Sequence, residues 1–391
     1  MKKIITMVGT SIFENYMKQN NDDTEFKNYV NDLKTRMADE YGNESIRIKK
    51  LKERLCNFSA MPVEDTSAEI KSIKKIQQQL NDNIEVFLLT SDTLLGILAG
   101  EIIKEKLKEI LNLDNPKDEK ISSLQIQDSQ EFINGMNNLI NKIYGIAKEY
   151  WNDVIINITG GFKATVPYLT ILGQINKCKI YYIFEDTDAL IEIPYIPLDI
   201  KWDVFEKNLD FFLELEKDGA QDKQNLQYND VAESLIEQAD NLIDFNPLGL
   251  SLWKKYRERF EIVKVSPSAA SLLNDNRREV EKIILELIKK YYISSQSSDL
   301  HHSLTDIDLK GFSIYKKKGT NVRVLYKTEA WMTRYKEKKY DFYIAEIFLK
   351  AHNSEDEYVQ EIKRLLGRVN VLNYKDYKTY RIEKQEDKSY V

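Results

Sequence analysis

From Asn157 to Lys177 the chain reads N-I-T-G-G-F-K-A-T-V-P-Y-L-T-I-L-G-Q-I-N-K, and the fold class follows from this stretch. Residues 154–158 are almost all apolar, which indicates a short buried strand of a parallel sheet. After residue 165 apolar side chains recur at helical spacing, and Pro167 is tolerated only near the start of a helix. The stretch therefore predicts a strand, a tight joint and a helix, in that order.

The joint between the strand and the helix is T-G-G-F-K, Thr159 to Lys163. Its two adjacent glycines let the backbone turn tightly and come close to a ligand. The start of a helix has unpaired N–H groups that favour an anion, whereas the helix dipole disfavours a cation such as Lys163 there. A bound phosphate would explain these features, and an ordinary glycine-rich turn with a solvated lysine would explain them equally well.

Length and composition are those of an ordinary soluble protein. The 391 residues are enough for two or three domains, and 42% of them are hydrophobic and 31% charged. No signal peptide precedes the first strand, and no apolar run approaches the roughly 18 residues of a membrane span. The two cysteines, Cys56 and Cys178, fit no zinc pattern, and the three histidines argue against a histidine-rich metal centre. We therefore expect a cytoplasmic protein with no metal and no membrane partner.

The net charge of −6 is unevenly distributed along the chain. Residues 251–391 contain 29 Lys or Arg against 21 Asp or Glu, a net charge of +8, whereas residues 1–250 carry a net charge of −14. A basic C-terminal part favours a polyanionic partner, although solvated surface lysines are also common.

Further apolar segments share the strand pattern of 154–158 and alternate with segments of helical periodicity. They are Lys3–Gly9, Ile84–Leu89, Ile121–Ile126, Lys179–Phe184 and Ala189–Ile193. Strands that alternate with helices predict an α/β fold with a parallel sheet and right-handed crossovers.

Polar residues directly follow three of these strands. They are Thr10-Ser11, Thr90-Ser91-Asp92 and Thr159 to Lys163. Because parallel strands end at the same edge of a sheet, we expect the three groups to lie along the edge where α/β proteins bind ligands. Ser11 could equally be an ordinary helix cap.

The rest of the chain has two further parts. Residues 201–250 are acidic and their pattern predicts helices without strands, so we expect a helical linker that ends near Pro247-Leu248-Gly249. Residues 251–391 read as a strand, two helices, three strands, a closing helix and a last strand near Val369–Tyr374. This order predicts a small α+β domain after a first domain at residues 1–200.

Residues 1–200 resemble the CARF domain, the Rossmann-like sensor of CRISPR-associated effectors. The resemblance lies in G-T-S at Gly9–Ser11 and in N-I-T-G-G-F-K-A at Asn157–Ala164. It implies a homodimer that binds a cyclic oligoadenylate, with four or six nucleotides, and it favours phosphate at the glycine joint. The ligand-binding residues that it implies are Gly9, Thr10, Ser11, Thr90, Ser91, Thr159, Gly160, Gly161, Phe162 and Lys163.

Residues 258–366 resemble the RelE/HigB-like toxins, which cut messenger RNA in the ribosomal decoding site. The similar stretches are L-K-G-F-S-I-Y-K-K-K-G-T-N-V-R-V-L-Y-K and Y-I-A-E-I-F-L-K-A-H-N-S-E-D-E-Y-V-Q-E-I-K-R-L-L. By position the resemblance implies catalytic roles for Arg323, His352 and Tyr358. Where the family has lysines on the first hairpin strand, this chain has Ser313 and Tyr315, and its lysines Lys316, Lys317 and Lys318 follow directly.

These residue types suit metal-free RNA cleavage, which needs proton transfer and stabilisation of a charged phosphate. Arg323 could hold the phosphate with two hydrogen bonds, His352 could act as acid or base, and Tyr358 could relay a proton. The lysines could bind the RNA backbone or lower the pKa of a tyrosine. Each has a plainer alternative: a strand-face ion pair for Arg323, a surface loop for His352, core packing for Tyr358 and a solvated hairpin tip for the lysines.

An aromatic and basic segment follows the hairpin. Trp331, Arg334 and Lys336 could stack on and bind single-stranded RNA, although a partly buried loop would have the same composition.

The two resemblances therefore imply a type III CRISPR ancillary effector that is a ribosome-dependent endoribonuclease. It would need no cofactor other than its activator, cyclic tetra-adenylate or cyclic hexa-adenylate. Two alternatives stay open: a regulator that binds nucleic acid or ribosomes without cutting, and a sensor that degrades its own ring through Ser11 or Lys163.

Overall fold

The computed structural model divides the chain into two compact units. The N-terminal unit comprises Met1–Lys201, Glu233–Glu237 and Phe245–Lys254, and the C-terminal unit comprises Trp202–Ala232, Gln238–Asp244 and Lys255–Val391. Apart from the side chains of residues 63–64, 230–232 and 355–358, the structure describes residues 1–58, 62–113, 116–184, 189–217, 220–222, 230–302, 304, 307–333, 335–349, 355–367 and 376–384.

The N-terminal unit is built on a six-stranded sheet with the strand order β3-β2-β1-β4-β5-β6. All neighbouring pairs are parallel except β5 and β6, which are antiparallel at one edge. The predicted α/β fold with a parallel sheet is thus confirmed. The strands are β1 (Lys2–Met7), β2 (Ile84–Thr90), β3 (Lys117–Lys120), β4 (Val154–Asn157), β5 (Lys179–Ile183) and β6 (Leu190–Ile193).

Only the third of the predicted strands was misplaced. The structure has β3 at Lys117–Lys120, whereas the apolar segment Ile121–Ile126 forms the turn that follows it. Ile121 and Leu124 are buried in this turn, and the Ile121 N–H donates to the carbonyl of Thr90 at 2.9 Å. The apolar pattern therefore marked side chains that anchor a loop in the core.

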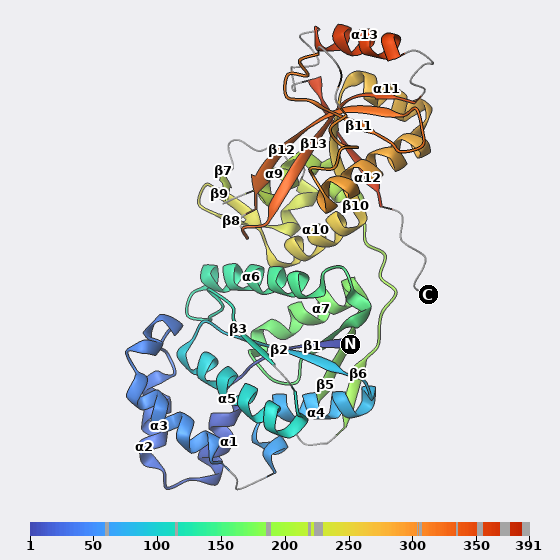
Figure 1. Ribbon diagram of the computed structural model, residues 1–391. Coiled ribbons are helices and arrows are strands. Elements are labelled where there is room, and N and C mark those ends of the chain that lie inside the picture. Colours follow the sequence, from blue (N-terminus) through green and yellow to red (C-terminus); the bar gives the residue numbers. More distant parts are fainter. Residues whose placement is uncertain are drawn as a thin grey trace. The chain divides into compact units, whose positions relative to one another are not determined.

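Helices cover both faces of the sheet, with α6 and α7 on one face and α1, α4 and α5 on the other (Figure 1). Alternate residues of β1 serve the two faces, and Ile4 belongs to the core cluster that includes α1 to α5. This three-layer arrangement places the helix N-termini at the carboxyl edge of the sheet. The helices are α1 (Ser11–Gln19), α2 (Thr24–Leu33), α3 (Ser45–Cys56), α4 (Ala68–Leu80), α5 (Leu94–Leu111), α6 (Ser129–Ala147) and α7 (Val166–Asn176).

The segment 201–250 is not the all-helical linker that the sequence predicted. It contains the helices α8 (Asp203–Lys207) and α9 (Leu209–Glu216) and also three short strands that form a separate sheet. Pro247 begins a helix, as proline can at a first helical position, so Pro247-Leu248-Gly249 is not a break between elements. The remaining elements are β7 (Gln221–Asp222), β8 (Ile236–Ala239), β9 (Leu242–Phe245) and α10 (Pro247–Arg259).

The C-terminal unit contains a five-stranded sheet with the order β11-β12-β13-β10-β14. The three strands that the sequence predicts in succession form an antiparallel meander, β11, β12 and β13, while β10 pairs in parallel with β13. The strands are β10 (Phe260–Val265), β11 (Ser313–Lys316), β12 (Arg323–Met332), β13 (Lys338–Phe348) and β14 (Lys378–Glu383). The strand expected near Val369–Tyr374 lies outside the described residues.

Two separate cores pack on this sheet. One contains apolar residues of α11 (Pro267–Asp275) and α12 (Arg277–Ile293), and the other contains residues of α13 (Glu355–Leu366). Leu325 of β12 belongs to the second core and its neighbours Val324 and Tyr326 to the first, so successive residues of this strand face opposite sides. Within the described part of the chain, no helix is long and apolar enough to cross a membrane.

Candidate functional site

The carboxyl ends of β1 and β4 form the topological switch point of the first sheet. After β1 the chain builds β2 and β3 on one side, and after β4 it builds β5 and β6 on the other. Open α/β sheets bind ligands at such a reversal of strand order. Two of the three predicted polar groups, Thr10-Ser11 and Thr159–Lys163, follow these two strands.

The two loops at the switch point pack against each other through glycines. A Cβ atom on Gly9 would lie 3.0 Å from the backbone nitrogen of Gly161. Gly161 has a φ of +93°, and a Cβ atom there would lie 2.3 Å from the Cβ atom of Met7. Close packing of the loops therefore requires these glycines, whether or not a ligand also approaches them.

A buried carboxylate that the sequence analysis missed lies between the loops. Glu69, in the first turn of α4, has no exposed surface. Its Oε1 accepts the N–H of Gly9 at 2.8 Å, and its Oε2 accepts the hydroxyls of Ser67 at 2.5 Å and Ser11 at 3.3 Å. A Cβ atom on Gly160 would lie 2.2 Å from Glu69 Oε1. The Gly9 N–H and the Ser11 hydroxyl therefore donate to Glu69, although the sequence analysis expected such groups of the first loop to bind a phosphate.

A second buried group, Asn157, fixes the loop that follows β4. Its Nδ2 donates to Thr6 Oγ1 at 3.1 Å and to Ser72 Oγ at 2.7 Å, joining β4 to β1 and to α4. Its Oδ1 accepts the N–H and the hydroxyl of Thr159, and Thr159 Oγ1 accepts the N–H of Ile183. The hydroxyl of Thr159 is therefore engaged inside the protein.

The predicted ligand residues differ in where their side chains lie. Ser11 is half-buried and bonded to Glu69, and the helix cap of α1 is Thr10, so Ser11 is not an ordinary cap. Thr90 and Ser91 end β2 at the same edge, but both are buried against α5. Ser91 Oγ lies 2.8 Å from the Oγ1 of Thr93, the residue that caps α5.

The side chains of the second loop that a ligand could reach are the exposed Lys163 and the half-buried Phe162. A single 3₁₀ turn, Lys163–Thr165, precedes α7, so Lys163 lies just before the α-helix rather than in its first turn. Lys163 is exposed and has no ion-pair partner among the described residues. The Phe162 ring lies 6.2 Å from that of Phe132, which lies 6.3 Å from that of Tyr168, so half-buried aromatic rings border the loop.

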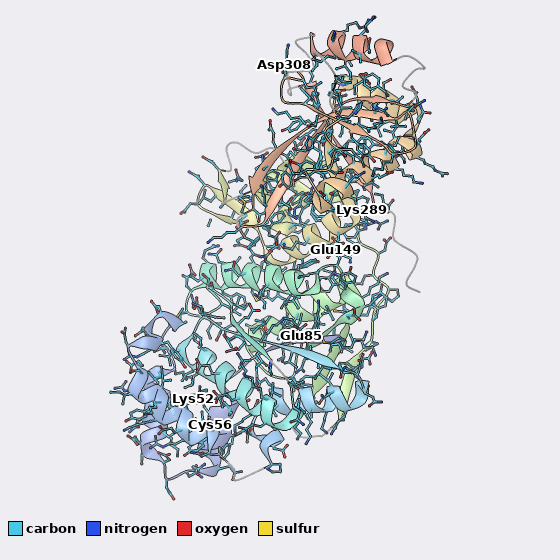
Figure 2. The ribbon with its side chains drawn as sticks, in the orientation of Figure 1. Lys52, Cys56, Glu85, Glu149, Lys289 and Asp308 are labelled. Carbon is cyan, nitrogen blue, oxygen red and sulfur yellow. The ribbon has the colours of Figure 1, made fainter. Side chains whose placement is uncertain are left out.

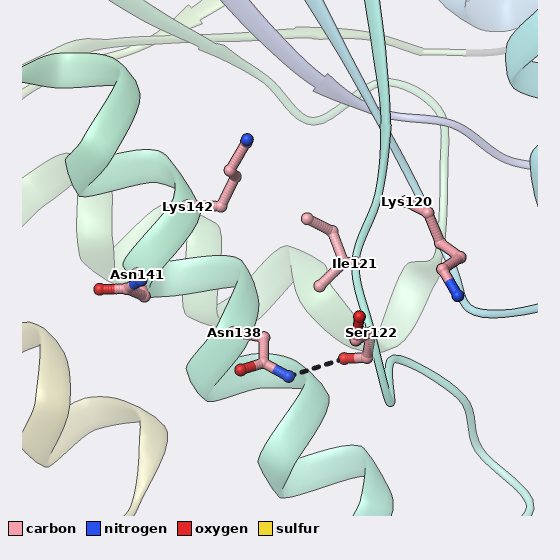
Figure 3. A pocket seen from close by; sticks show the side chains of 6 residues that line it. All are labelled: Lys120, Ile121, Ser122, Asn138, Asn141 and Lys142. Carbon is pink, nitrogen blue, oxygen red and sulfur yellow. Dashed lines mark hydrogen bonds between the residues drawn. The ribbon is translucent and has the colours of Figure 1, made fainter. Parts of the chain in front are cut away.

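A hollow of about 200 Å³ lies at the carboxyl end of β3, beside α6 (Figure 3). Asn138 lines it and donates to the carbonyl of Ser122 at 2.9 Å. Both of its lysines are neutralised: Lys120 pairs with Asp92 at 2.9 Å, and Lys142 pairs with Glu119. The hollow therefore offers hydrogen-bonding groups rather than free cations.

Cys56 carries no sign of reactivity, and Cys178 is buried. Cys56 lies one turn after Lys52 on α3 (Figure 2), and burial together with a hydrogen bond to Glu105 raises the pKa of its thiol. A raised pKa keeps the sulfur protonated, so Cys56 is a poor nucleophile. No cluster of metal-binding side chains occurs in the described ranges.

In the C-terminal unit, strand pairing distinguishes the three candidate lysines. Lys316 is directly opposite Arg323 in the β11–β12 pair, so both residues belong to the same face of the sheet. Lys316 is exposed and has no ion-pair partner in the described part of the unit. In contrast, Lys317 pairs with Glu286 at 2.7 Å and Lys318 with Asp299 at 3.5 Å.

Arg323 is folded back toward the hairpin turn. Its Nη1 donates to the carbonyls of Thr320 at 3.2 Å and Val322 at 2.9 Å. Of its proposed partners, His352 lies outside the described residues, and Tyr358 lies in α13, where its side chain is not described. Of the predicted catalytic residues whose side chains the structure describes, only Lys316 is paired with Arg323 across the hairpin.

The proposed RNA-binding residues lie around the turn between β12 and β13. Trp331 is half-buried on β12 and donates from Nε1 to Asp341 Oδ1 at 3.1 Å. Lys336 is exposed in the turn with a φ of +61°, and Arg334 lies outside the described residues. Burial raises the pKa of Asp341, and the hydrogen bond from Trp331 partly opposes this effect.

Acidic side chains of α8 and α9 pair with basic residues of the C-terminal unit. Glu206 accepts from Arg381 at 2.6 Å, and Asp210 accepts from Lys264 at 3.0 Å. The C-terminal unit as a whole contains 31 Lys or Arg and 31 Asp or Glu, so its net charge is zero. The excess of basic charge at the C-terminus is thus balanced within the unit.

Comparison with known proteins gives one family. Residues 64–196 match the model of a CRISPR-associated protein family, Cas_APE2256, which supports a CRISPR-associated role for the chain. The match includes Glu69 and the loop after β4, and it leaves Gly9–Ser11 and the C-terminal sheet outside. A comparison with curated proteins found no match.

Proposed function

We propose that this chain is a CRISPR-associated effector in which a cyclic oligoadenylate, bound to the N-terminal unit, activates cleavage of messenger RNA by the C-terminal unit. The observation that carries the proposal is the switch point between β1 and β4, where two glycine loops meet and the second of them lies inside the region similar to a CRISPR-associated family. The resemblance of residues 1–200 to the CARF domain supplies the ligand class.

The sensor proposal rests on chemistry at the carboxyl edge of the first sheet. Lys163 is an exposed cation beside the second glycine loop, and Phe162 adds an aromatic surface suited to a base. A ring of identical nucleotides matches a two-fold dimer, in which each protomer would contribute one such edge. These features support a cyclic nucleotide over a simple anion.

The effector proposal rests on the resemblance of residues 258–366 to RelE/HigB-like toxins and on the pairing of Lys316 with Arg323. Two cations on one face of a sheet would stabilise the charged phosphate of the transition state. Proton transfer would fall to His352 and Tyr358. The small number of acid and base groups is consistent with an enzyme whose active site is completed by the ribosome.

The test follows one mRNA on programmed ribosomes and the same RNA free in solution. Each is incubated with the protein alone, with cyclic tetra-adenylate and with cyclic hexa-adenylate, and cleavage is read by primer extension. We expect cleavage only where ribosome and ring are both present, and loss of cleavage in Arg323→Ala. Lys163→Ala should require a higher ring concentration while keeping the same cleavage positions.

Other outcomes separate the alternatives. Cleavage of the free RNA would keep the nuclease and remove ribosome dependence. Ring binding without cleavage in any lane would favour a regulator that only binds nucleic acid or ribosomes. Chromatography of the ring after long incubation tests whether the sensor degrades it.

A further inference from the structure

We infer that Glu69 fixes Ser11 as a hydrogen-bond acceptor, so that the Ser11 oxygen recognises a donor group of a nucleoside and not a phosphate. The donor is a ribose 2′-hydroxyl or the amino group of adenine. This inference deepens the proposed function and rests on it, because it assigns a role to one loop of the same site.

The first step is the environment of Glu69. The carboxylate is fully buried, and within the described residues it accepts from the Gly9 N–H and the hydroxyls of Ser67 and Ser11. No cation pairs with it among the described residues. Its charge is therefore balanced by uncharged donors, each of which must direct its proton at the carboxylate.

The second step concerns the hydrogen bonds that the hydroxyls of Ser67 and Ser11 donate and accept. A serine hydroxyl has one proton to donate and two lone pairs with which to accept. Ser67 uses its lone pairs internally, because its Oγ accepts the N–H groups of Glu69 at 3.2 Å and Ile70 at 3.5 Å. Ser11 gives its proton to Glu69, and no described residue donates to its Oγ. Because Ser11 is only half-buried at the binding edge, its free lone pairs are available to a ligand.

The third step excludes a phosphate oxygen as the partner of Ser11 Oγ. Phosphate oxygens only accept hydrogen bonds from protein groups, and the Ser11 hydroxyl, like the Gly9 N–H, is already directed at Glu69. A phosphate would also lie close to a buried negative charge. The phosphates of a bound ring would instead lie near the exposed Lys163 of the second loop.

The experiment compares three rings by calorimetry on the full chain: cyclic tetra-adenylate, its 2′-deoxy form and cyclic tetra-inosinate, which lacks the amino group. The corresponding rings of six nucleotides, cyclic hexa-adenylate, its 2′-deoxy form and cyclic hexa-inosinate, are titrated in parallel. We expect the wild type to bind one of the two analogues about 5- to 100-fold more weakly than the parent ring, as for the loss of one hydrogen bond to Ser11 in each of the two protomers. Which analogue is weaker identifies the hydroxyl or the amino group as the donor.

Two variants test the role of Ser11 and Glu69. Ser11→Ala removes the acceptor and should bind parent and analogue equally. Glu69→Gln presents an amide donor to Ser11, releases the serine proton and should likewise abolish the preference. Glu14→Gln, which removes an exposed carboxylate from the same helix as Ser11, should keep the preference of the wild type.

If the wild type binds the parent ring and both analogues of the same ring size with equal affinity, the inference is overturned and the proposed function stays intact. A preference that survives in Ser11→Ala would also overturn it. If the wild type binds no ring of either size, the sensor proposal itself fails, and the inference fails with it.

Discussion

Gly160 and Gly161 are neighbours in the chain, but different contacts require each of them. Gly160 leaves room for the carboxylate of Glu69, whereas Gly161 has a positive φ and touches Met7. A side chain at position 160 would displace a functional group, and one at position 161 would strain the backbone. The two positions should therefore respond differently to substitution.

Gly161→Ala tests the backbone requirement. We expect the free energy of unfolding to fall by about 1–3 kcal/mol, because alanine must adopt a disfavoured φ and its Cβ atom would overlap Met7. Gly145→Ala is the matched control: Gly145 is exposed in α6 with nothing within 4 Å, so this change should stabilise by about 0.5–1 kcal/mol. Urea denaturation measures both, and an unchanged midpoint for Gly161→Ala would contradict the close approach of the loops.

Asp341 gives a prediction about pH. Its pKa is raised in the folded protein, chiefly by burial, so the folded state binds this proton more tightly than the unfolded chain does. The ionised carboxylate therefore lowers stability above its folded pKa, and this cost disappears as the pH falls below its ordinary pKa of about 4. Asp341→Asn keeps an oxygen for Trp331 Nε1 and should raise the denaturation midpoint at pH 7.

The stabilising effect of Asp341→Asn should shrink as the pH is lowered from 7 to 3. Asp275→Asn, an exposed carboxylate at the end of α11, serves as the control and should change stability by less than about 0.5 kcal/mol. If the stabilisation by Asp341→Asn instead grows as the pH falls, the pKa of Asp341 is not raised by folding and the prediction is wrong.

Sequence reasoning at this scale found the glycines and missed the carboxylate between them. The pair Gly160-Gly161 is visible because adjacent glycines after a buried strand have few explanations. Ser67-Ala68-Glu69 is an ordinary helix start, with a serine cap and an acidic first turn. Only the fold brings this helix start to the ends of β1 and β4, so no local pattern could have indicated Glu69.

At the scale of elements, periodicity located most strands and helices because burial on a sheet face leaves a regular apolar pattern. It failed where apolar residues anchor a turn, as at Ile121–Ile126, and where a strand lacks a run of apolar residues, as at β8, in which only Ile236 is buried. Strand pairing also separates residues that the sequence groups together. Lys316, Lys317 and Lys318 are consecutive, but only Lys316 is paired across the hairpin with Arg323.

This register predicts unequal roles for the lysines in RNA cleavage. Lys316→Ala should lower the rate about 10- to 100-fold, as for the loss of one hydrogen bond to a charged group. Lys318→Ala is the matched control: Lys318 is 80% exposed and pairs with Asp299, so its loss should change the rate less than about threefold. Single-turnover cleavage on programmed ribosomes measures both, and equal losses would reject the role assigned to the register.

At the scale of the whole molecule, charge summed along the sequence was a poor guide to the charge of a folded unit. The basic C-terminal part includes Arg381 and Lys264, which pair with the acidic residues Glu206 and Asp210 of the preceding segment. Because those acidic residues belong to the same compact unit, its net charge is zero and not +8. Any attraction to a polyanion must come from local groups such as Lys316 and Arg323.

The assignment of residues to the two units has a consequence for how such a gene can change. The chain passes between the units at five points, after residues 201, 232, 237, 244 and 254, and α10 contributes residues to both. A single recombination event joins one continuous segment to another, so no single crossover can exchange one complete unit for a foreign one. Intact modules could be swapped only by moving the whole interval 202–254 with one of its neighbours and rebuilding the surfaces that it leaves behind. The two units are therefore expected to be inherited together and to diverge as a pair.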